Sequence, residues 1–245
     1  MSLSSEDLRS KAYYDEFSKR YDDERGGRVR GGYHDLLDEL EVSLVERYGR
    51  EKDVLEVGCG TGLLLEQFAR FARSAKGVDL SEGMLAKATA RGLDATLGSA
   101  TELPFDAETF DVACSFKVLA HVPDIDRALS EMVRVVRPGG HVLAEFYNPH
   151  SFRALTKRLF GPQAVGRAIK EDAVFTRFDT PEEVARRTPS GCNLVGVRGI
   201  RIVTPVASAM KVPVLRDALG WAERRLADGP LARFAGFYVA IWQKA

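Results

Sequence analysis

The sequence predicts an α/β fold in which a mostly parallel, seven-stranded sheet carries helices on both faces. From residue 53 onwards, short apolar runs with strand character alternate with helical patterns, and such alternation is typical of parallel strands joined by crossover helices. Residues 54–62 run from a strand directly into a turn with three glycines and then into a helix, which is half of a nucleotide-binding βαβ unit. With 245 residues, 45% of them apolar, the chain is long enough for one large domain of this kind.

The apolar pattern places each element of this sheet. Strands are expected at 53–57, 75–79, 94–97, 110–115, 141–147, 194–203 and 236–243. Helices are expected between them at 62–73, 82–91 and 124–136, and Arg137-Pro138-Gly139-Gly140 is expected to form the turn before the fifth strand. The capping box Thr180-Pro181-Glu182-Glu183 predicts that a further helix starts there.

Two helices, at 5–23 and 33–48, are expected ahead of the first strand, with a glycine-rich hinge between them at 25–32. We therefore interpret residues 1–245 as a single domain, in which 1–48 form a helical lid and 49–147 form the ligand-binding core. Two insertions, at 148–178 and 205–233, are expected on the substrate side of the sheet. The first is basic with interleaved apolar residues, which favours a segment that covers a pocket over one that lies on a membrane.

Bulk composition argues against several classes of function. Thirty-five basic residues balance thirty-five acidic ones, so the net charge does not indicate DNA or RNA as a partner. No run of about 18 apolar residues predicts a membrane span. The start of the sequence lacks the pattern of a signal peptide, and we expect a cytoplasmic protein without stable membrane insertion. The three cysteines are scattered, so neither disulfides nor a metal site is expected.

The glycine turn predicts where a nucleotide-like ligand binds. Gly58, Gly60 and Gly62 let the backbone approach a ligand closely, and the following helix offers unpaired N–H groups. The next strand ends in Asp79, whose carboxylate oxygens can accept hydrogen bonds from both hydroxyls of a ribose. The dinucleotide fingerprint G-x-G-x-x-G also ends in such an acid, but Leu63 stands where its third glycine or an alanine is needed. A nicotinamide-dependent oxidoreductase therefore stays an alternative that Leu63 argues against.

The string Leu55-Glu56-Val57-Gly58-Cys59-Gly60-Thr61-Gly62, followed by Asp79, resembles the first two motifs of class I S-adenosylmethionine-dependent methyltransferases. The resemblance covers roughly residues 50–147. It implies a Rossmann-like sheet whose last strand is antiparallel, with S-adenosyl-L-methionine (SAM) as cofactor, S-adenosyl-L-homocysteine (SAH) as product and no metal. The implied cofactor-binding residues here are Glu56 for the amino group, Gly58 and Gly60 for methionine and ribose, Cys59 as a space-filling member of the turn, Asp79 for the ribose, and Leu80 and Met84 for adenine.

Residues 97–105, which read LGSATELPF, are similar to the third motif of this family, where an Asp accepts a hydrogen bond from the adenine amino group. Ser99 takes the place of that Asp, and Ala100 follows it where the backbone meets the edge of the ring. A neutral hydroxyl is a weaker acceptor than a carboxylate by about 1 kcal/mol, so we expect a modest affinity for SAM. This departure keeps a non-catalytic SAM-binding protein open as an alternative.

The loop after the fourth strand, residues 116–124, is expected to face the transferring methyl group, because ligands of open α/β sheets bind beyond the carboxyl ends of the strands. It contributes Lys117 to the cofactor-binding residues and His121 as the candidate general base, which would take a proton from an acceptor hydroxyl. His150, just past the fifth strand, is the second catalytic candidate. The loop lacks the Asn/Asp-Pro-Pro-Tyr signature of many nucleic-acid amino-methyltransferases, which argues against DNA as the acceptor.

The N-terminal stretch Tyr14-Asp15-Glu16-Phe17-Ser18-Lys19-Arg20-Tyr21-Asp22 resembles the first helix of small-molecule methyltransferases that are related to quinone-biosynthesis enzymes. In those proteins the helix closes over the cofactor and brings aromatic rings near the sulfonium, where a cation beside ring faces is favourable. The resemblance implies that Tyr14 and Tyr21 belong to the cofactor-binding residues. The alternative is that this aromatic face only packs on the core.

Together these features predict an enzyme that transfers a methyl group from SAM to a small-molecule acceptor. O- or C-methylation of an apolar, phenolic or quinone-like acceptor is favoured, because both insertions that are expected to build the acceptor site are lipophilic. RNA or a protein is a less favoured acceptor, since phosphate contacts need a basic face. The oligomeric state and the identity of the acceptor stay open.

Overall fold

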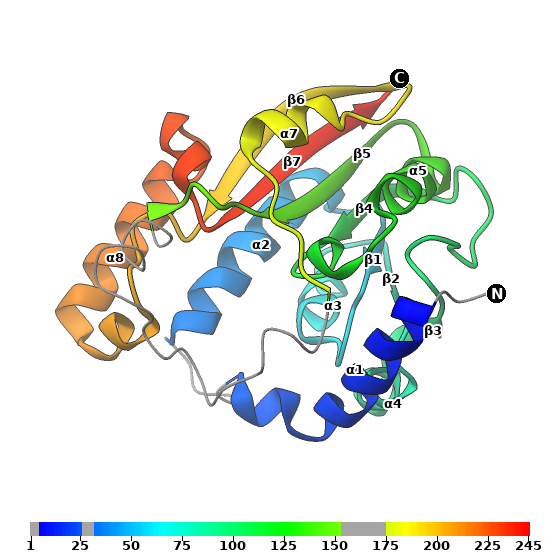
Figure 1. Cartoon of the computed structure of the whole chain (residues 1–245), viewed down its shortest axis with the longest axis horizontal. Coiled ribbons are helices and arrows are strands. Elements are labelled where there is room, and N and C mark those ends of the chain that lie inside the picture. The colour runs from blue at the N-terminus through cyan, green and yellow to red at the C-terminus, as the bar shows by residue number, and fades with distance from the viewer. Residues whose placement is uncertain (1–4, 26–31, 153–174) are drawn as a thin grey trace.

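The computed structural model describes residues 5–25, 32–152 and 175–245, and these residues contain the predicted sheet (Figure 1). Its seven strands pair in the order β3-β2-β1-β4-β5-β7-β6. The pairs β1–β2, β1–β4, β2–β3 and β4–β5 are parallel, whereas β7 is antiparallel to both β5 and β6. The expected Rossmann-like sheet with an antiparallel last strand is confirmed.

Most elements begin and end within two or three residues of their predicted positions. The strands are β1 Asp53–Val57, β2 Ser74–Asp79, β3 Asp94–Leu97, β4 Phe110–Ser115, β5 Val136–Tyr147, β6 Cys192–Ile200 and β7 Phe237–Lys244. The α-helices are α1 Ser5–Glu24, α2 Tyr33–Gly49, α3 Leu63–Phe68, α4 Glu82–Ala90, α5 Ile125–Val135, α7 Pro181–Arg186 and α8 Pro213–Leu226. Short 3₁₀ turns are η1 Leu119–His121, η3 Ala207–Lys211 and η4 Pro230–Phe234. The Thr180 capping box is confirmed, because its side chain accepts from the Glu183 N–H while Glu183 accepts from the Thr180 N–H.

Two boundaries were predicted wrongly. Residues 137–140 are part of β5 rather than a turn, because Val136 already pairs with Phe110 of β4. The pairing then shifts, so that Val112 of β4 lies opposite His141, and Gly139 takes a positive φ of 78° within this irregular stretch. A bulge of this kind combines a Pro-Gly-Gly sequence with a continuous strand. Helix α3 ends at Phe68 rather than at residue 73, since residues 69–73 turn back toward β2.

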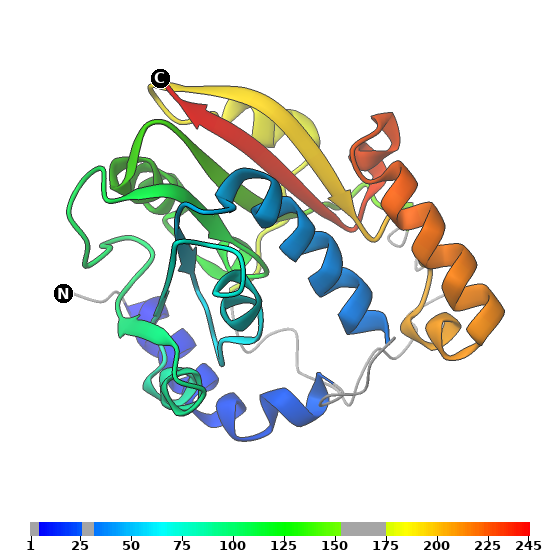
Figure 2. The same ribbon diagram turned by 180° about the vertical axis from the view of Figure 1, so that it is seen from behind.

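Helices cover both faces of the sheet and bury two apolar cores. On one face, α2 and α3 pack Leu37, Leu44, Leu65 and Phe68 against β1, β4 and β5 (Figure 2). On the other face, α5 and α7 pack their apolar residues against the alternate residues of these strands and against β7, among them Phe146 and the fully buried Trp242. The central strands are therefore buried between the two layers, whereas the edge strands β3 and β6 are partly exposed.

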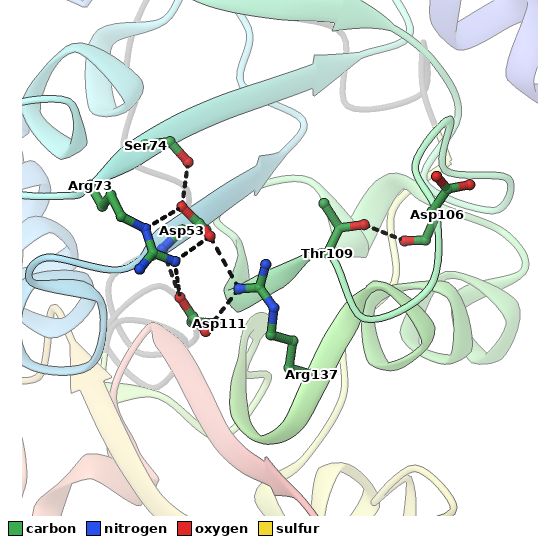
Figure 3. A network of polar contacts seen from close by, with 7 residues as sticks. All are labelled: Asp53, Arg73, Ser74, Asp106, Thr109, Asp111 and Arg137. Carbon is green, nitrogen blue, oxygen red and sulfur yellow. Dashed lines mark hydrogen bonds and ion pairs between the residues drawn. The ribbon is translucent and has the colours of Figure 1, made fainter.

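An ion-pair network joins four strands at the amino-terminal edge of the sheet (Figure 3). Arg137 of β5 donates to Asp111 of β4 at 2.9 Å and to Asp53 of β1 at 3.1 Å. Asp53 also accepts from Arg73 at 2.9 Å and from Ser74 of β2 at 2.8 Å. This network fixes the register at the edge of the sheet that lies opposite the glycine turn.

The predicted insertions are described only in part. Residues 153–174 lie outside the described residues, and with them most of the basic segment; the same is true of residues 26–31 in the predicted hinge. The second insertion contains α8, whose buried Glu223 accepts hydrogen bonds from the backbone N–H groups of residues 202–204. Within the described ranges, no helix is long and apolar enough to cross a membrane.

Candidate active site

The glycine turn after β1 is fixed by the neighbouring strand β2. The N–H groups of Gly58 and Cys59 both donate to the Val78 carbonyl, at 2.7 and 3.0 Å. Gly58 has a φ of +79°, and a side chain there would lie 2.3 Å from a methyl group of Val118. Gly60 has a φ of +54°, but a Cβ on it would meet no atom of the described residues within 4 Å. The turn therefore presents bare backbone to an open space at Gly60.

Asp79 at the end of β2 closes this turn. Its Oδ2 accepts from the Gly60 N–H at 2.8 Å, and its Oδ1 accepts from the Ser81 N–H at 2.9 Å. Burial raises the pKa of Asp79, although the backbone N–H groups act in the opposite direction. Each carboxylate oxygen can accept more than one hydrogen bond, so Asp79 can hold the turn and still receive hydroxyl donors from a ligand.

Glu56 on β1 is buried, with 3% of its surface exposed, and its Oε2 has no hydrogen-bond partner among the described residues. Burial, with Glu41 and Asp79 nearby, raises its pKa well above the ordinary range. A buried carboxyl without a partner is costly, which makes it a receptor for a donor or a cation. The thiol of the adjacent Cys59 is buried, and burial raises its pKa, so this cysteine is not a nucleophile at neutral pH.

The residues predicted for the adenine lie around the start of α4 and after β3. Met84 is buried and its N–H donates to the Ser81 hydroxyl, whereas Leu80 and Ala100 are half-buried. The Ser99 hydroxyl accepts from the Thr101 N–H at 3.2 Å and shares a hydrogen bond with the Thr101 hydroxyl at 2.8 Å. The Ser99 hydroxyl therefore already forms two hydrogen bonds within its own turn.

Helix α1 is fastened beside the glycine turn by two aspartates. Asp15 accepts from the Ser81 hydroxyl at 2.6 Å and from the Gly83 N–H at 3.0 Å, at the first turn of α4. Asp22 accepts from Thr61 in the glycine turn at 2.7 Å and from Arg91 at 2.8 Å.

The sequence reasoning chose Tyr14 and Tyr21 from this helix and missed both aspartates. Burial raises the pKa of each of these tyrosines. The signal for the aspartates was present, because each one directly follows a tyrosine of the same motif.

His121 lies in η1 with one ring nitrogen bound. Its Nδ1 is 2.9 Å from the Phe175 carbonyl oxygen. A carbonyl only accepts, so Nδ1 carries the proton and Nε2 is the basic nitrogen. Burial lowers the pKa of His121 below its ordinary 6.5, which keeps the ring neutral at pH 7. The ring meets Tyr147 edge-on at a centroid distance of 5.6 Å and lies 6.4 Å from the Tyr14 ring.

The described end of the basic insertion, from residue 175 onwards, holds His121 in place. The Arg177 N–H donates to the Ala120 carbonyl at 2.7 Å, and its guanidinium donates to the Val122 and Pro123 carbonyls. His150, in contrast, is exposed, and its N–H donates to the Asn148 side chain in a local turn. The catalytic assignment of His150 stays a prediction without a contact that supports it.

Lys117 pairs its ammonium group with two acids of α2. It has an uncommon φ of +61°, its N–H donates to Glu145 at 2.9 Å, and its Nζ lies 2.5 Å from Glu41 Oε1. Glu41 and Glu145 were both missed from the sequence. Glu41 lies on the apolar face of α2 four residues after Leu37, and Glu145 interrupts an otherwise apolar strand, so each was detectable as an acid in an apolar pattern.

No group of three or more His, Cys, Asp or Glu side chains in the described part of the chain has an arrangement that could hold a metal ion. The described site therefore consists of a glycine turn, carboxylates, aromatic rings and one histidine. These groups can bind a polar ligand that carries hydroxyls and a positive charge, and they can accept a proton next to it.

Comparisons with known proteins agree with this geometry. Residues 55–144 match the family model described as a methyltransferase domain. The ubiquinone biosynthesis O-methyltransferase of Cupriavidus pinatubonensis is 30% identical over 158 residues, which are 61% of this chain and 63% of that protein. The protein with the same name from Coxiella burnetii is 31% identical over 157 residues, 61% of this chain and 67% of that protein. The chain thus spans roughly two thirds of the length of these relatives.

Solved structures share the whole fold at lower identity. A SAM-dependent methyltransferase from Thermotoga maritima, described as a possible histamine N-methyltransferase, aligns with a TM-score of 0.63 at 20% identity and covers 97% of this chain and 99% of its own. An S-adenosylmethionine-dependent methyltransferase from Mesorhizobium loti aligns with a TM-score of 0.60 at 19% identity, over 85% of this chain and 98% of its own. By the sequence match to its relatives, the chain belongs to the class I SAM-dependent small-molecule methyltransferases.

Proposed function

We propose that the protein transfers a methyl group from SAM to a hydroxyl group of a small, largely apolar acceptor of phenolic or quinone-like type. The observation that carries this proposal is the orientation of His121. Nδ1–H donates a hydrogen bond to the Phe175 carbonyl, so Nε2 of the neutral ring is free to act as a base. The ring packs against aromatic side chains near the carboxyl ends of β4 and β5. The names of the curated relatives support an oxygen acceptor.

The residues present fit SAM as the cofactor. The unpartnered Glu56 oxygen suits the amino group of the methionine part, and the open space over Gly60 suits a ligand that lies against the backbone. Asp79 retains acceptor capacity for the ribose hydroxyls. When bound, SAM supplies a methyl group on a sulfonium, which is already activated for displacement. Its adenine would meet Leu80, Met84 and Ala100, with Ser99 as a weak polar partner.

The side chains of this chain then position the acceptor and move one proton. His121 Nε2 would take the hydroxyl proton as the acceptor oxygen gains its methyl group, and the Phe175 carbonyl would stabilise the charged ring through Nδ1–H. Tyr14 and Tyr147 would form the apolar walls beside this base. Helix α1, anchored through Asp15 and Asp22, would act as the lid that excludes water.

The aromatic surroundings support an apolar ring as acceptor. Tyr147 contacts Phe178 and Phe237 at ring distances of 6.1 and 5.3 Å, and the Phe178 side chain is 59% exposed. Exposed aromatic surface beside a candidate base is suited to stack a planar acceptor. C-methylation would use the same base, because removal of a phenolic proton also activates the ring carbons next to it.

Two measurements test this function. Calorimetric titration with SAH, with NAD as the control, tests the cofactor; we expect binding of SAH alone. Incubation of the protein with catechols, hydroquinones and simple phenols, with SAM labelled in the methyl group, tests the reaction, and mass spectrometry of the product locates the label. We expect label on oxygen, and loss of turnover but not of SAH binding in His121→Gln. SAH binding without label transfer to any acceptor would instead favour the non-catalytic SAM-binding alternative.

A further inference from the structure

Three buried carboxyl groups lie together next to the proposed cofactor site. Glu41 of α2 is fully buried, and Glu56 of β1 and Glu145 of β5 are 3% and 1% exposed. Because side chains alternate along a strand, Glu56 and Glu145 lie on the same face of the sheet as Val54 and Leu143, which is the face that α2 covers. The three acids therefore share one interior space between α2 and the carboxyl ends of the strands.

The cations nearby neutralise only part of this negative charge. Lys117 Nζ lies 2.5 Å from Glu41 and 3.6 Å from Asp38, and Arg25 donates to Asp38 at 2.6 Å. Two cations thus face four carboxylates, and neither Glu56 nor Glu145 forms an ion pair within 4 Å among the described residues. Oε2 of each of these two also has no hydrogen-bond partner there.

Among the other titratable groups around the three acids, Asp79 adds a further acid next to Glu56, whereas burial raises the pKa of the neighbouring thiols of Cys59 and Cys114 and keeps them neutral at pH 7. From α1, Tyr21 faces the acids, and burial raises its pKa. From β5, Tyr147 faces the acids, with its pKa likewise raised by burial. His34 at the start of α2 is kept neutral, since burial lowers its pKa to about 4. The negative charge of the acids is therefore not balanced from these elements.

The buried acids hold protons as long as no positively charged ligand is bound next to them. Burial, followed by the nearby Glu41, raises the pKa of Glu145 to about 8, and burial raises those of Glu41 and Glu56. Keeping two uncompensated carboxylates ionised in the interior is costly, so protonation is the favoured state at neutral pH.

We propose that the buried acids Glu41, Glu56 and Glu145 couple cofactor binding to proton release and thereby favour the positively charged SAM over SAH. This inference rests on the proposed function. SAM and SAH differ by the methyl group and by the one positive charge of the sulfonium. Only SAM therefore brings the additional charge that can replace a proton in the cluster. Glu41 is the centre of the coupling, because it interacts electrostatically with both other acids and pairs with Lys117.

The proton balance of a full cycle closes. Binding of SAM releases one proton from the cluster to solvent. During methyl transfer, the S–CH₃ bond breaks with its electron pair left on sulfur, the O–CH₃ bond forms, and the acceptor hydroxyl gives up its proton. The positive charge at sulfur is then gone, so the cluster takes up one proton again. Binding of SAH alone therefore leaves the cluster protonated as in the free protein, so only the affinity for SAM should rise with pH.

Calorimetry in buffers of different ionisation enthalpy counts the protons. At pH 7 and 8, SAM and SAH are titrated into the protein in phosphate and in Tris. We expect SAM binding to release more protons than SAH binding, and the SAM-to-SAH affinity ratio to rise with pH by up to about tenfold per pH unit for a full proton. Equal proton counts for the two ligands at both pH values would overturn the inference. Failure of both ligands to bind would instead refute the proposed function.

Two matched variants separate the protein's protons from those of the ligand. Glu145→Gln keeps the shape of the protonated acid, so it should fold, and we expect it to lose most of the difference in proton release between SAM and SAH. Glu39→Gln is the control, because Glu39 lies on the same helix as Glu41 but is exposed and pairs with Arg224. We expect Glu39→Gln to behave as the wild type. If both variants kept the wild-type difference, Glu145 would have no part in the coupling.

Discussion

Replacing Gly60 by alanine tests where the cofactor lies, and Gly92 provides a matched control. Both glycines have positive φ, +54° and +78°, and at neither position would a Cβ meet another described atom within 4 Å. Gly60 is in the glycine turn, whereas Gly92 lies outside this turn, just after the end of α4. The two substitutions therefore impose the same kind of backbone strain and differ in what the added methyl group faces.

The magnitude follows from the geometry. A left-handed conformation costs an alanine about 1–2 kcal/mol, so each variant should lower the melting temperature by roughly 2–8 °C in a chain of this size. Gly58→Ala adds a clash, because its Cβ would lie 2.3 Å from Val118, and overpacking of this kind costs about 1–3 kcal/mol more. We expect the wild type to be the most stable, Gly60→Ala and Gly92→Ala to be equally less stable, and Gly58→Ala to be the least stable.

The assay compares stability and affinity in the same samples. Thermal unfolding gives the stability, and calorimetric titration with SAH gives the affinity. If the cofactor occupies the space over Gly60, Gly60→Ala should lose at least tenfold in SAH affinity, which is about 1.4 kcal/mol, while Gly92→Ala stays within twofold of the wild type. Equal SAH affinity in the two variants would refute the assignment of this space to the cofactor.

Further predictions concern the base, the lid and the ion-pair network. His121→Gln should lower turnover by about 10²–10⁴-fold. Because burial lowers the pKa of His121, the wild-type rate should be full at pH 7 and fall on the acid side below 6.5; an unchanged pH profile in the variant would exclude the base role. Asp22→Asn should weaken SAH binding and expose α1 to limited proteolysis, which gel electrophoresis detects; equal cleavage of variant and wild type would contradict the anchoring role. Arg73 holds the pKa of Asp53 below its ordinary 3.8, so the stability from this network is present above that pH and is lost as the pH falls through the lower folded value. Urea unfolding of wild type and Asp53→Asn should differ at pH 6 and converge toward pH 2, and a constant difference would show that the Asp53 charge is not responsible.

The fold was predictable because its signals are local. Each signal depends on only a few neighbouring residues. This holds for the apolar patterns of period two and 3.6, for the glycine turn and for the Thr180 capping box. The start of β5 was missed, because Pro138 and Gly139 are typical of turns and only pairing with β4 makes them part of a strand. The residues predicted to bind the cofactor at the turn come from the same local motif, and the structure places Glu56, Gly60 and Asp79 close together.

The acceptor side of the site was less predictable, since its contacts join residues that are far apart in the chain. The basic nitrogen of His121 is selected by the carbonyl of Phe175, 54 residues later, and a backbone carbonyl leaves no signature in a sequence. Lys117 was assigned to the cofactor from its loop, but its side chain reaches Glu41 of α2, which only the packing of α2 on the sheet brings within 2.5 Å. A loop motif therefore indicates which backbone lies at the strand ends, whereas charge balance across packed elements decides where its side chains point. In this chain that balance places Lys117 with the buried acids and leaves His121 as the titratable side chain that the aromatic rings of Tyr14 and Tyr147 surround.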